Sequence, residues 1–178
     1  IWFYPVGTDD TEITNYVSYN YAENLWAVGT LDRGAWIGYS KNSNPIASSV
    51  NTGVTDANYL YNHETGFDDD GQAMTAFVES GDLEIGEGER FMMISRIIPD
   101  FSFRGATSNA SVDFTIKGSN FPLETPTTQA TATVTSSTQQ SHIRTRARHA
   151  VVRIESSGSG FGWRLGDLRF DMRQDGRR

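Results

Sequence analysis

The densest group of side chains that could bind a metal ion is the acidic run Asp68, Asp69 and Asp70, followed by Gly71. A calcium loop of the EF-hand type needs oxygen ligands at alternating positions, a glycine at the sixth position and a glutamate at the twelfth. Glu79 does occupy the twelfth position counted from Asp68, but the glycine comes two places early and the next donor positions are apolar. The run therefore predicts an acidic hairpin loop or a stretch of acidic channel wall, and we expect no metal there.

Histidines and nucleophile motifs give no catalytic pattern. His63, His142 and His149 lie too far apart for the usual zinc spacing. The sequence has no Gly-x-Ser-x-Gly elbow, no phosphate-binding loop and no dinucleotide fingerprint. The glycine-rich stretch 157–162 lacks the lysine and the helix that phosphate binding uses, and it predicts a hairpin loop. We therefore expect no catalytic residue, no cofactor and no enzymatic activity.

Paired carboxylates could still hydrolyse a glycosidic bond in a β protein with exposed aromatic residues. Asp82 and Glu84 are candidates, because alternate residues of a strand share one face. The chain holds 22 acidic residues, however, so many other pairs would qualify equally well. A polysaccharide hydrolase remains the weakest of the functional hypotheses.

A basic stripe is predicted near the C-terminus, where Arg144, Arg146 and Arg148 alternate and would face one side of a strand. Such a stripe could bind phosphates, but no aromatic residues are interleaved with it to stack on bases. Pairing with acidic residues of a neighbouring subunit explains it better, because the rest of the chain is strongly acidic. We expect Arg177 and Arg178 to belong to the same subunit interface.

The net charge of −7 is unevenly distributed. Residues 1–100 carry 4 basic and 16 acidic side chains, whereas residues 140–178 carry 9 basic and 4 acidic ones. All nine basic residues of the last segment are arginines, and arginine is favoured at interfaces for its planar fork and weaker hydration. An acidic body with an arginine-rich end indicates contacts between subunits or between different proteins.

Nearly every ordered segment shows a two-residue apolar period or β-rich composition, which predicts an all-β fold. The absence of cysteine excludes a disulfide framework, and the apolar runs are too short for a membrane-spanning helix. The predicted strands are Ile1–Tyr4, Tyr16–Tyr21, Leu25–Val28, Gly34–Gly38, Tyr59–His63, Met74–Glu79, Phe91–Ile98, Ser111–Lys117, Ala130–Val134, His142–Arg146, Ala150–Ile154 and Gly162–Arg164.

Two regions are expected. Residues 1–80 contain an aromatic strand, an acidic turn and a tryptophan-bearing strand between Asn15 and Gly38, an order typical of a β-propeller blade. A propeller needs at least about four blades. Since the chain begins at Ile1 inside an apolar run, we expect this region to be incomplete. Residues 81–178 predict an antiparallel β-sandwich-like region, with a Ser/Thr-rich stretch at 122–141 that forms a long loop and an exposed strand.

Two passages carry a resemblance to a known family. The first is YNYAENLWAVGTLDRGAWIG with the following NHETGFDDDG, TAFVESG and FMMISRIIP, and the second is the ending FGWRLGDLRFDMRQDGRR with the arginines upstream of it. Both resemble the C-terminal part of the tail nozzle proteins of short-tailed bacteriophages, also described as tail tube or packaged-DNA-stabilising proteins. The family carries further blades and an inserted domain that this chain does not contain.

The resemblance implies a virion structural protein, assembled in the bacterial cytoplasm, where the absence of cysteine is suitable. It implies a ring of identical subunits, typically six, that contacts adaptor and other tail proteins. Such a ring continues the DNA channel, retains the packaged genome and opens for ejection, so double-stranded DNA passes through it transiently. The alternative hypothesis is a glycan-binding β module of a phage tail or cell-surface protein, which would use exposed tyrosine and tryptophan rings.

Overall fold

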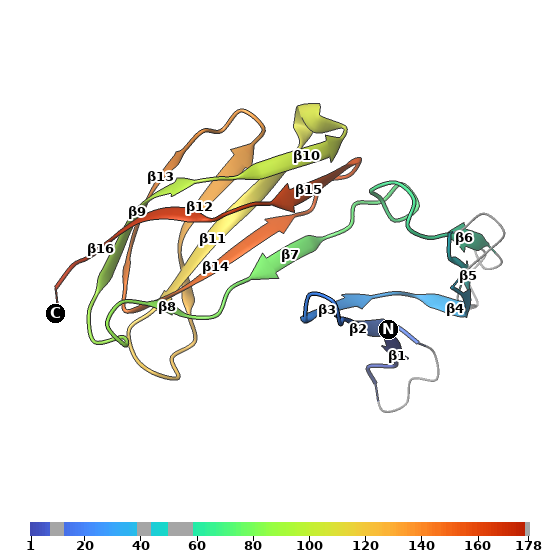
Figure 1. Ribbon diagram of the computed structural model, residues 1–178, viewed down its shortest axis with the longest axis horizontal. Coiled ribbons are helices and arrows are strands. Elements are labelled where there is room, and N and C mark those ends of the chain that lie inside the picture. Colours follow the sequence, from blue (N-terminus) through green and yellow to red (C-terminus); the bar gives the residue numbers. More distant parts are fainter. Residues whose placement is uncertain (8–12, 39–43, 50–58, 177–178) are drawn as a thin grey trace. The chain divides into compact units, whose positions relative to one another are not determined.

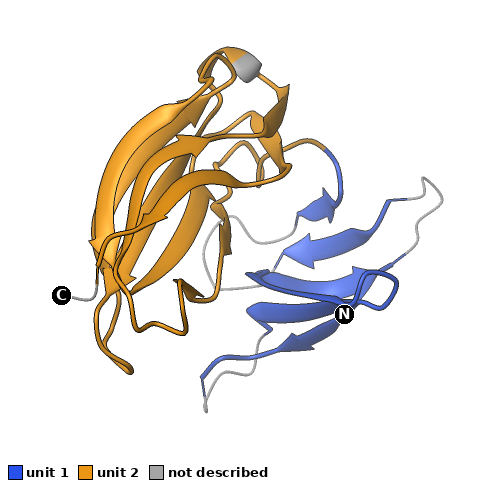
Figure 2. Cartoon of the chain, turned by 60° about the vertical axis from the view of Figure 1, so that its left-hand side comes forward, with its two compact units in different colours: residues 1–65 blue, residues 66–178 orange. Residues whose placement is uncertain are grey.

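The computed structural model describes residues 1–7, 13–38, 44–49 and 59–176. Over these residues the chain folds into strands β1 to β16 and one short 3₁₀ turn (Thr107–Asn109), without an α-helix. The predicted all-β class is therefore confirmed. The chain forms two compact units, Ile1–Thr65 and Gly66–Arg178, which Figure 2 shows in different colours.

The sequence pattern places the boundary between the two regions at residue 80. The boundary between the two units lies earlier, after Thr65. Strand β7 (Ala76–Glu79) pairs with β14 (His149–Ser156), with Glu79 opposite Arg153. Hydrogen bonding to a strand so far along the sequence makes β7 part of the second unit. Aromatic composition, which groups these residues with the first unit, does not reveal this pairing.

The first unit consists of two three-stranded antiparallel sheets. One contains β1 (Trp2–Tyr4), β2 (Asn15–Asn20) and β3 (Leu25–Thr30) in that order. The other contains β4 (Arg33–Ile37), β5 (Ile46–Ser49) and β6 (Leu60–Asn62). The predicted antiparallel strands are present in this unit, and their assignment to a propeller stays a prediction.

The hairpin between β2 and β3 is set by polar and small residues. The Asn20 side-chain oxygen accepts a hydrogen bond from the backbone nitrogen of Ala22 at 3.1 Å, and Asn24 closes the turn with φ of 55°. Asparagine tolerates this left-handed conformation better than most residues. Further along β3, Gly29 lies beneath the Tyr16 ring, where an added Cβ would come within 2.6 Å of the ring. The glycine thus allows Tyr16 to lie flat on the sheet.

The second unit is built in two layers (Figure 1). The first layer has the order β12-β11-β14-β7, formed by β12 (Thr127–Thr135), β11 (Ser111–Ser119), β14 and β7, and the short β8 (Leu83–Glu84) also pairs with β14. As predicted, a strand runs through the Ser/Thr-rich stretch. It forms an edge of the sheet, and threonine suits this position because it is both polar and β-branched.

The second layer combines two ladders. One has the order β13-β9-β16, formed by β13 (Ser141–Ala147), β9 (Met92–Ile98) and β16 (Arg169–Gln174). The other pairs β10 (Phe101–Gly105) with β15 (Phe161–Leu165). β10 follows β9 after two residues and β16 follows β15 after three, and the Gly166 nitrogen donates to the Asp100 carbonyl between them at 2.8 Å. The two ladders therefore continue one another.

A hydrophobic core fills the space between the layers. Its fully buried members come from both sides and include Ile94 and Ile97 of β9, Phe114 of β11 and Ile154 of β14. Phe101 meets Phe114 edge-on, with ring centroids 5.5 Å apart. Val112, Phe114 and Ile116 of β11 are all buried, as the two-residue apolar period of this segment predicts.

Candidate functional site

One face of the β1-β2-β3 sheet is apolar and open. The register places Trp2, Val17 and Val28 side by side, and Tyr19 opposite Trp26. Because alternate residues share a face, these five side chains lie on the same side of the sheet. Trp2, Trp26 and Val28 are 55%, 63% and 66% exposed. We call this set of five residues the aromatic face.

The rings of the aromatic face pack on one another. Trp26 stacks on Tyr19 with ring centroids 4.5 Å apart, and on Trp2 with centroids 6.0 Å apart. The interplanar angles of 28° and 27° are those of stacked rings. Such pairs order the side chains before any partner arrives, and this pre-organisation lowers the entropic cost of binding.

Part of the opposite face of the same sheet is covered from within the unit. Phe3 contacts Tyr16 and Trp36, with ring centroids 6.5 and 5.7 Å apart, and Trp36 also lies 4.6 Å from His63. Trp36 takes part in packing within the unit, whereas Trp26 has most of its surface open.

Burial in the first unit is too small to account for its aromatic content. Among its described residues, only the small Pro45 and Ala47 are fully buried, whereas the large apolar side chains of Leu25 and Leu60 are exposed. Monomeric proteins rarely leave contiguous apolar surface of this kind uncovered, and larger exposed patches mark interaction sites. The aromatic face is therefore the main candidate for an interaction surface in this unit.

The predicted arginine stripe is only partly available for a neighbour. Arg144 and Arg146 are exposed on β13, while Thr145 between them is buried, so the predicted shared face exists. The Arg146 guanidinium donates to the Asp175 carboxylate, with Nε to Oδ2 at 2.7 Å, and lies 3.8 Å from the Phe91 ring centroid.

Arg148 also binds within the chain, since its guanidinium donates to the carbonyl oxygens of Gly88 and Glu89 at 3.1 and 2.6 Å. Two of the three arginines thus have partners in their own subunit. Their role at a subunit interface stays a prediction, and Arg177 and Arg178 lie outside the described residues.

The acidic run forms a tight turn. The Asp68 carboxylate accepts a hydrogen bond from the Gly160 nitrogen, which ties this turn to the loop before β15. The backbones of Asp69 and Gln72 exchange two hydrogen bonds of 2.9 Å, and Asp70 adopts φ of 51° at the turn. No group of three or more possible metal ligands occurs in the described part of the chain. The loop prediction fits this geometry, and the channel-wall prediction stays untested.

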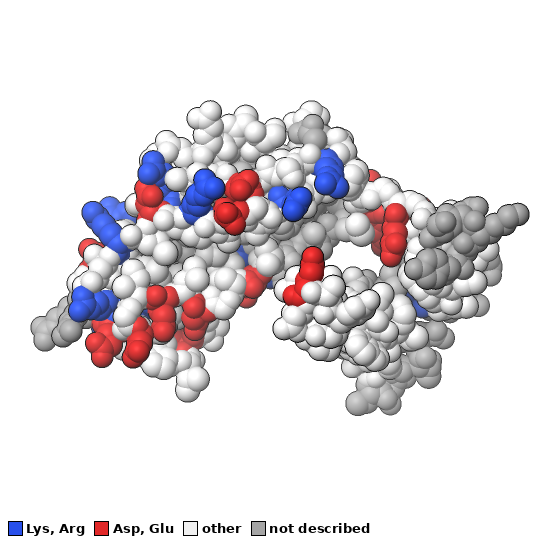
Figure 3. All heavy atoms as spheres, viewed as in Figure 1, with Lys and Arg blue, Asp and Glu red and all other residues white. Residues whose placement is uncertain are grey.

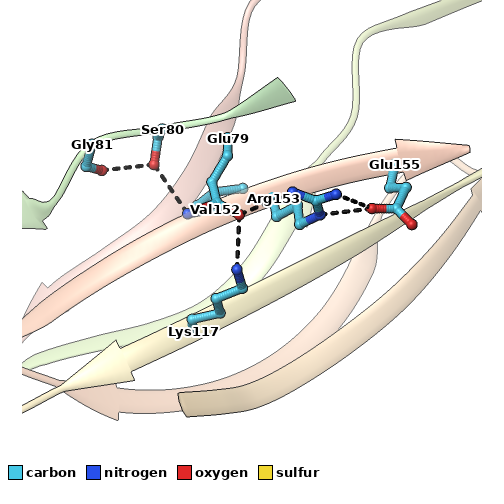
Figure 4. A network of polar contacts seen from close by, with 7 residues as sticks. All are labelled: Glu79, Ser80, Gly81, Lys117, Val152, Arg153 and Glu155. Carbon is cyan, nitrogen blue, oxygen red and sulfur yellow. Dashed lines mark hydrogen bonds and ion pairs between the residues drawn. The ribbon is translucent and has the colours of Figure 1, made fainter. Parts of the chain in front are cut away.

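Charged side chains from three strands meet on the outer face of the first layer (Figure 4). The Lys117 ammonium donates to the Glu79 carboxylate at 2.8 Å, and Arg153 reaches the same oxygen at 3.3 Å. The hydrogen bond from Lys117 holds the pKa of Glu79 below its ordinary value, and the hydrogen bond to Glu155 raises the pKa of Arg153. Sequence reasoning missed this network because its members lie on separate strands, up to 76 residues apart.

The two carboxylates considered for hydrolysis have different surroundings. Glu84 lies 3.1 Å from Nδ1 of His149, which is its cross-strand neighbour. Asp82 lines a shallow cavity of about 270 Å³ together with Ser119, Leu123 and His149. This cavity brings neither a metal cluster nor a nucleophile–base hydrogen bond together among the described residues.

The comparisons with known proteins place no further constraint on this geometry. No protein-family model matches the chain, and no curated protein matches it. None of the described segments is a helix long and apolar enough to cross a membrane.

Proposed function

We propose that the chain is a non-enzymatic virion structural protein, a subunit of the tail nozzle ring of a short-tailed phage. In this proposal the ring continues the DNA channel, retains the packaged genome and opens for ejection. It contains identical subunits, six by the resemblance, and contacts the adaptor and other tail proteins.

The observation that carries the proposal is the open aromatic face. Trp2, Trp26 and Val28 expose a stacked, apolar sheet surface in a unit that buries little of its own. Burial of apolar surface contributes about 25 cal/mol per Å², so covering this face would supply a large part of an assembly interface. We assign the covering partner as a neighbouring copy of the same chain.

A glycan-binding module is the second candidate, because exposed tryptophan rings also stack on sugars. The composition of the face favours the first candidate. Val28 is aliphatic and exposed beside the rings, and the aliphatic Val17 lies opposite it on the same face. Sugar-binding platforms need polar groups near the ring to fix the hydroxyls, whereas a protein neighbour buries aliphatic and aromatic groups alike.

The test replaces Val28 with Glu and measures the mass of the particles in solution by light scattering over a range of concentrations. The original chain should form a closed oligomer, and the variant should be shifted to monomer because a charge cannot be buried there without a partner. Leu123→Ser is the matched control, since Leu123 is fully exposed and lies in the second unit. A monomer at all concentrations for the original chain, together with a signal on a glycan array, would favour the second candidate.

A further inference from the structure

Seven arginines lie on the outer face of the second layer of the second unit. We call them the arginine face: Arg96, Arg104, Arg144, Arg146, Arg164, Arg169 and Arg173. They come from all five strands of that layer, β9, β10, β13, β15 and β16. Figure 3 shows basic side chains spread along this layer on the side toward the viewer.

The direction of these side chains follows from the alternation of the strands. On β16, Phe170 packs against the core, so its neighbours Arg169 and Asp171 point outward. Arg173, two residues after Asp171, also points outward. On β13, the core contact of Ile143 and the burial of Thr145 leave Arg144 and Arg146 outside.

The β10–β15 ladder extends the same face. Phe101, Phe103 and Trp163 pack against the core, which turns Arg104 and Arg164 outward. Both arginines are exposed. Because this ladder continues the β9–β16 ladder, the basic side chains form one continuous surface.

The charge of the face is positive after the carboxylates of its own strands and of their connections are counted, and the acidic run that begins at Asp68 lies beyond the start of β15, next to Gly160. Asp171 pairs with Arg96 at 2.6 Å, and Asp175 pairs with Arg146 at 2.7 Å. Asp100 and Asp167 lie where the two ladders join, so seven arginines face four aspartates. The exposed His142 adds no negative charge. The guanidinium groups of five arginines make no hydrogen bond or ion pair with any described residue: Arg104, Arg144, Arg164, Arg169 and Arg173.

The face has few of the apolar anchors that a protein partner would need. Stable protein interfaces are centred on buried aromatic or aliphatic residues, with charges at the rim. Among the described residues in or against this layer, the large exposed apolar ones are few: Met172, which alternates away from the arginines, Leu168 in the β15–β16 connection, and Phe67, whose ring packs against Gly105 and Gly162. A phosphate backbone needs no such anchor, because charge alone supplies non-specific binding. Two aromatic rings lie against this layer: Phe91, which the Arg146 and Arg148 guanidinium groups cover, and Phe67, which packs against Gly105 and Gly162. They do not form the row of open rings on which single-stranded nucleic acid stacks.

We propose that the arginine face binds the phosphate backbone of double-stranded nucleic acid without reading its sequence. This inference deepens the proposed function, since it assigns the contact with DNA to one face of the second unit. It also changes the interpretation of the arginine stripe. Arg144 contributes to the DNA-binding face together with arginines of four other strands, whereas the Arg148 guanidinium binds backbone carbonyl groups of its own chain.

The test measures binding of the full chain to a short fluorescent duplex of mixed sequence by anisotropy, between about 50 and 200 mM salt. The logarithm of the affinity should fall linearly with the logarithm of the salt concentration. The triple variant Arg144→Gln, Arg169→Gln and Arg173→Gln removes three arginines that have no partner in the described chain, so the fold should be kept. Its slope should be shallower by up to about 2.7, at about 0.9 for each lost phosphate contact.

The reverse change gives an independent readout. The variant Asp171→Asn with Asp175→Asn removes two carboxylates from the face and should bind the duplex more tightly. Asp82→Asn with Asp113→Asn changes the net charge equally at exposed positions beside β8 and on β11, in the other layer of the same unit, and it should bind like the original chain. Equal gains in the two double variants would show that total charge is responsible, and this would overturn the assignment.

Two other results would also overturn it: no duplex binding at the lowest salt, or tighter binding of poly-glutamate of matched charge, which would indicate an acidic protein partner. If a monomer binds the duplex, the DNA-binding role of the arginine face is supported even when no ring forms. If a ring assembles but does not bind the duplex, the DNA-binding role is refuted and the proposed assembly is unaffected.

Discussion

Lys117 of β11 reaches across β14 to Glu79 of β7, and its ammonium lies 2.8 Å from the carboxylate. β7 is an edge strand of its layer and lies close to the start of the second unit. The contact therefore connects this edge strand to β11, which is the third strand of the layer counted from β7. Arg153, which lies between them on β14, donates to Glu79 as well and covers the Phe77 ring at 3.9 Å.

Replacing Lys117 with Met should destabilise the second unit modestly, because the pair is partly exposed and such pairs contribute about 0.2–1 kcal/mol. The pH dependence has a definite sign. The pKa of Glu79 is lowered in the folded chain from its ordinary value of 4.5, so its contribution is present above pH 4.5 and is lost as the pH falls through the folded pKa.

Urea unfolding of both chains at several pH values measures this effect. The difference between them should be largest near neutral pH and shrink in acid. Arg164→Met is the control, since it removes an exposed charge without a partner among the described residues. A difference that grows as the pH falls would contradict the assigned contact.

Replacing Gly29 with Ala should disturb the first unit, because the new Cβ would come within 2.6 Å of the Tyr16 ring. Overpacking of this kind costs about 1–3 kcal/mol. Near-ultraviolet circular dichroism reports the aromatic stacking and should lose intensity. Gly81 has open space around its Cβ position, so Gly81→Ala is the matched control. An unchanged spectrum for Gly29→Ala would show that Tyr16 does not lie on β3.

Replacing Phe114 with Ala should cost about 3–5 kcal/mol of unfolding free energy in the second unit, since its side chain is fully buried between the two layers. Phe121→Ala removes the same atoms from a side chain that is 69% exposed and should cost far less. Chemical denaturation of the two variants measures the difference. Similar losses for both would mean that Phe114 is not the centre of the core.

The sequence predicts the β class and most strands because alternation is a local signal. It misses β5 (Ile46–Ser49), whose small residues lack a clear apolar period. It also misses β16 (Arg169–Gln174), because Phe170 is flanked by charged residues and gives only a weak apolar signal. The boundary at Thr65 could not be found locally either, since it depends on the pairing of β7 with β14.

The candidate surfaces were predictable to different degrees. The alternation of Arg144 and Arg146 on one face follows from strand geometry alone. Their different roles do not, because Asp175 lies 29 residues from Arg146 in sequence and meets it through the pairing of β13 and β16 with β9. The open position of Trp26 depends on what covers each side of a sheet, which no single strand reveals.

The central claim is that the chain assembles with copies of itself through the aromatic face. Electron microscopy of the concentrated protein, negatively stained, tests this most directly when the original chain is compared with Val28→Glu. Closed rings are expected for the original chain and single particles for the variant. Single particles for both, or rings for both, would contradict it.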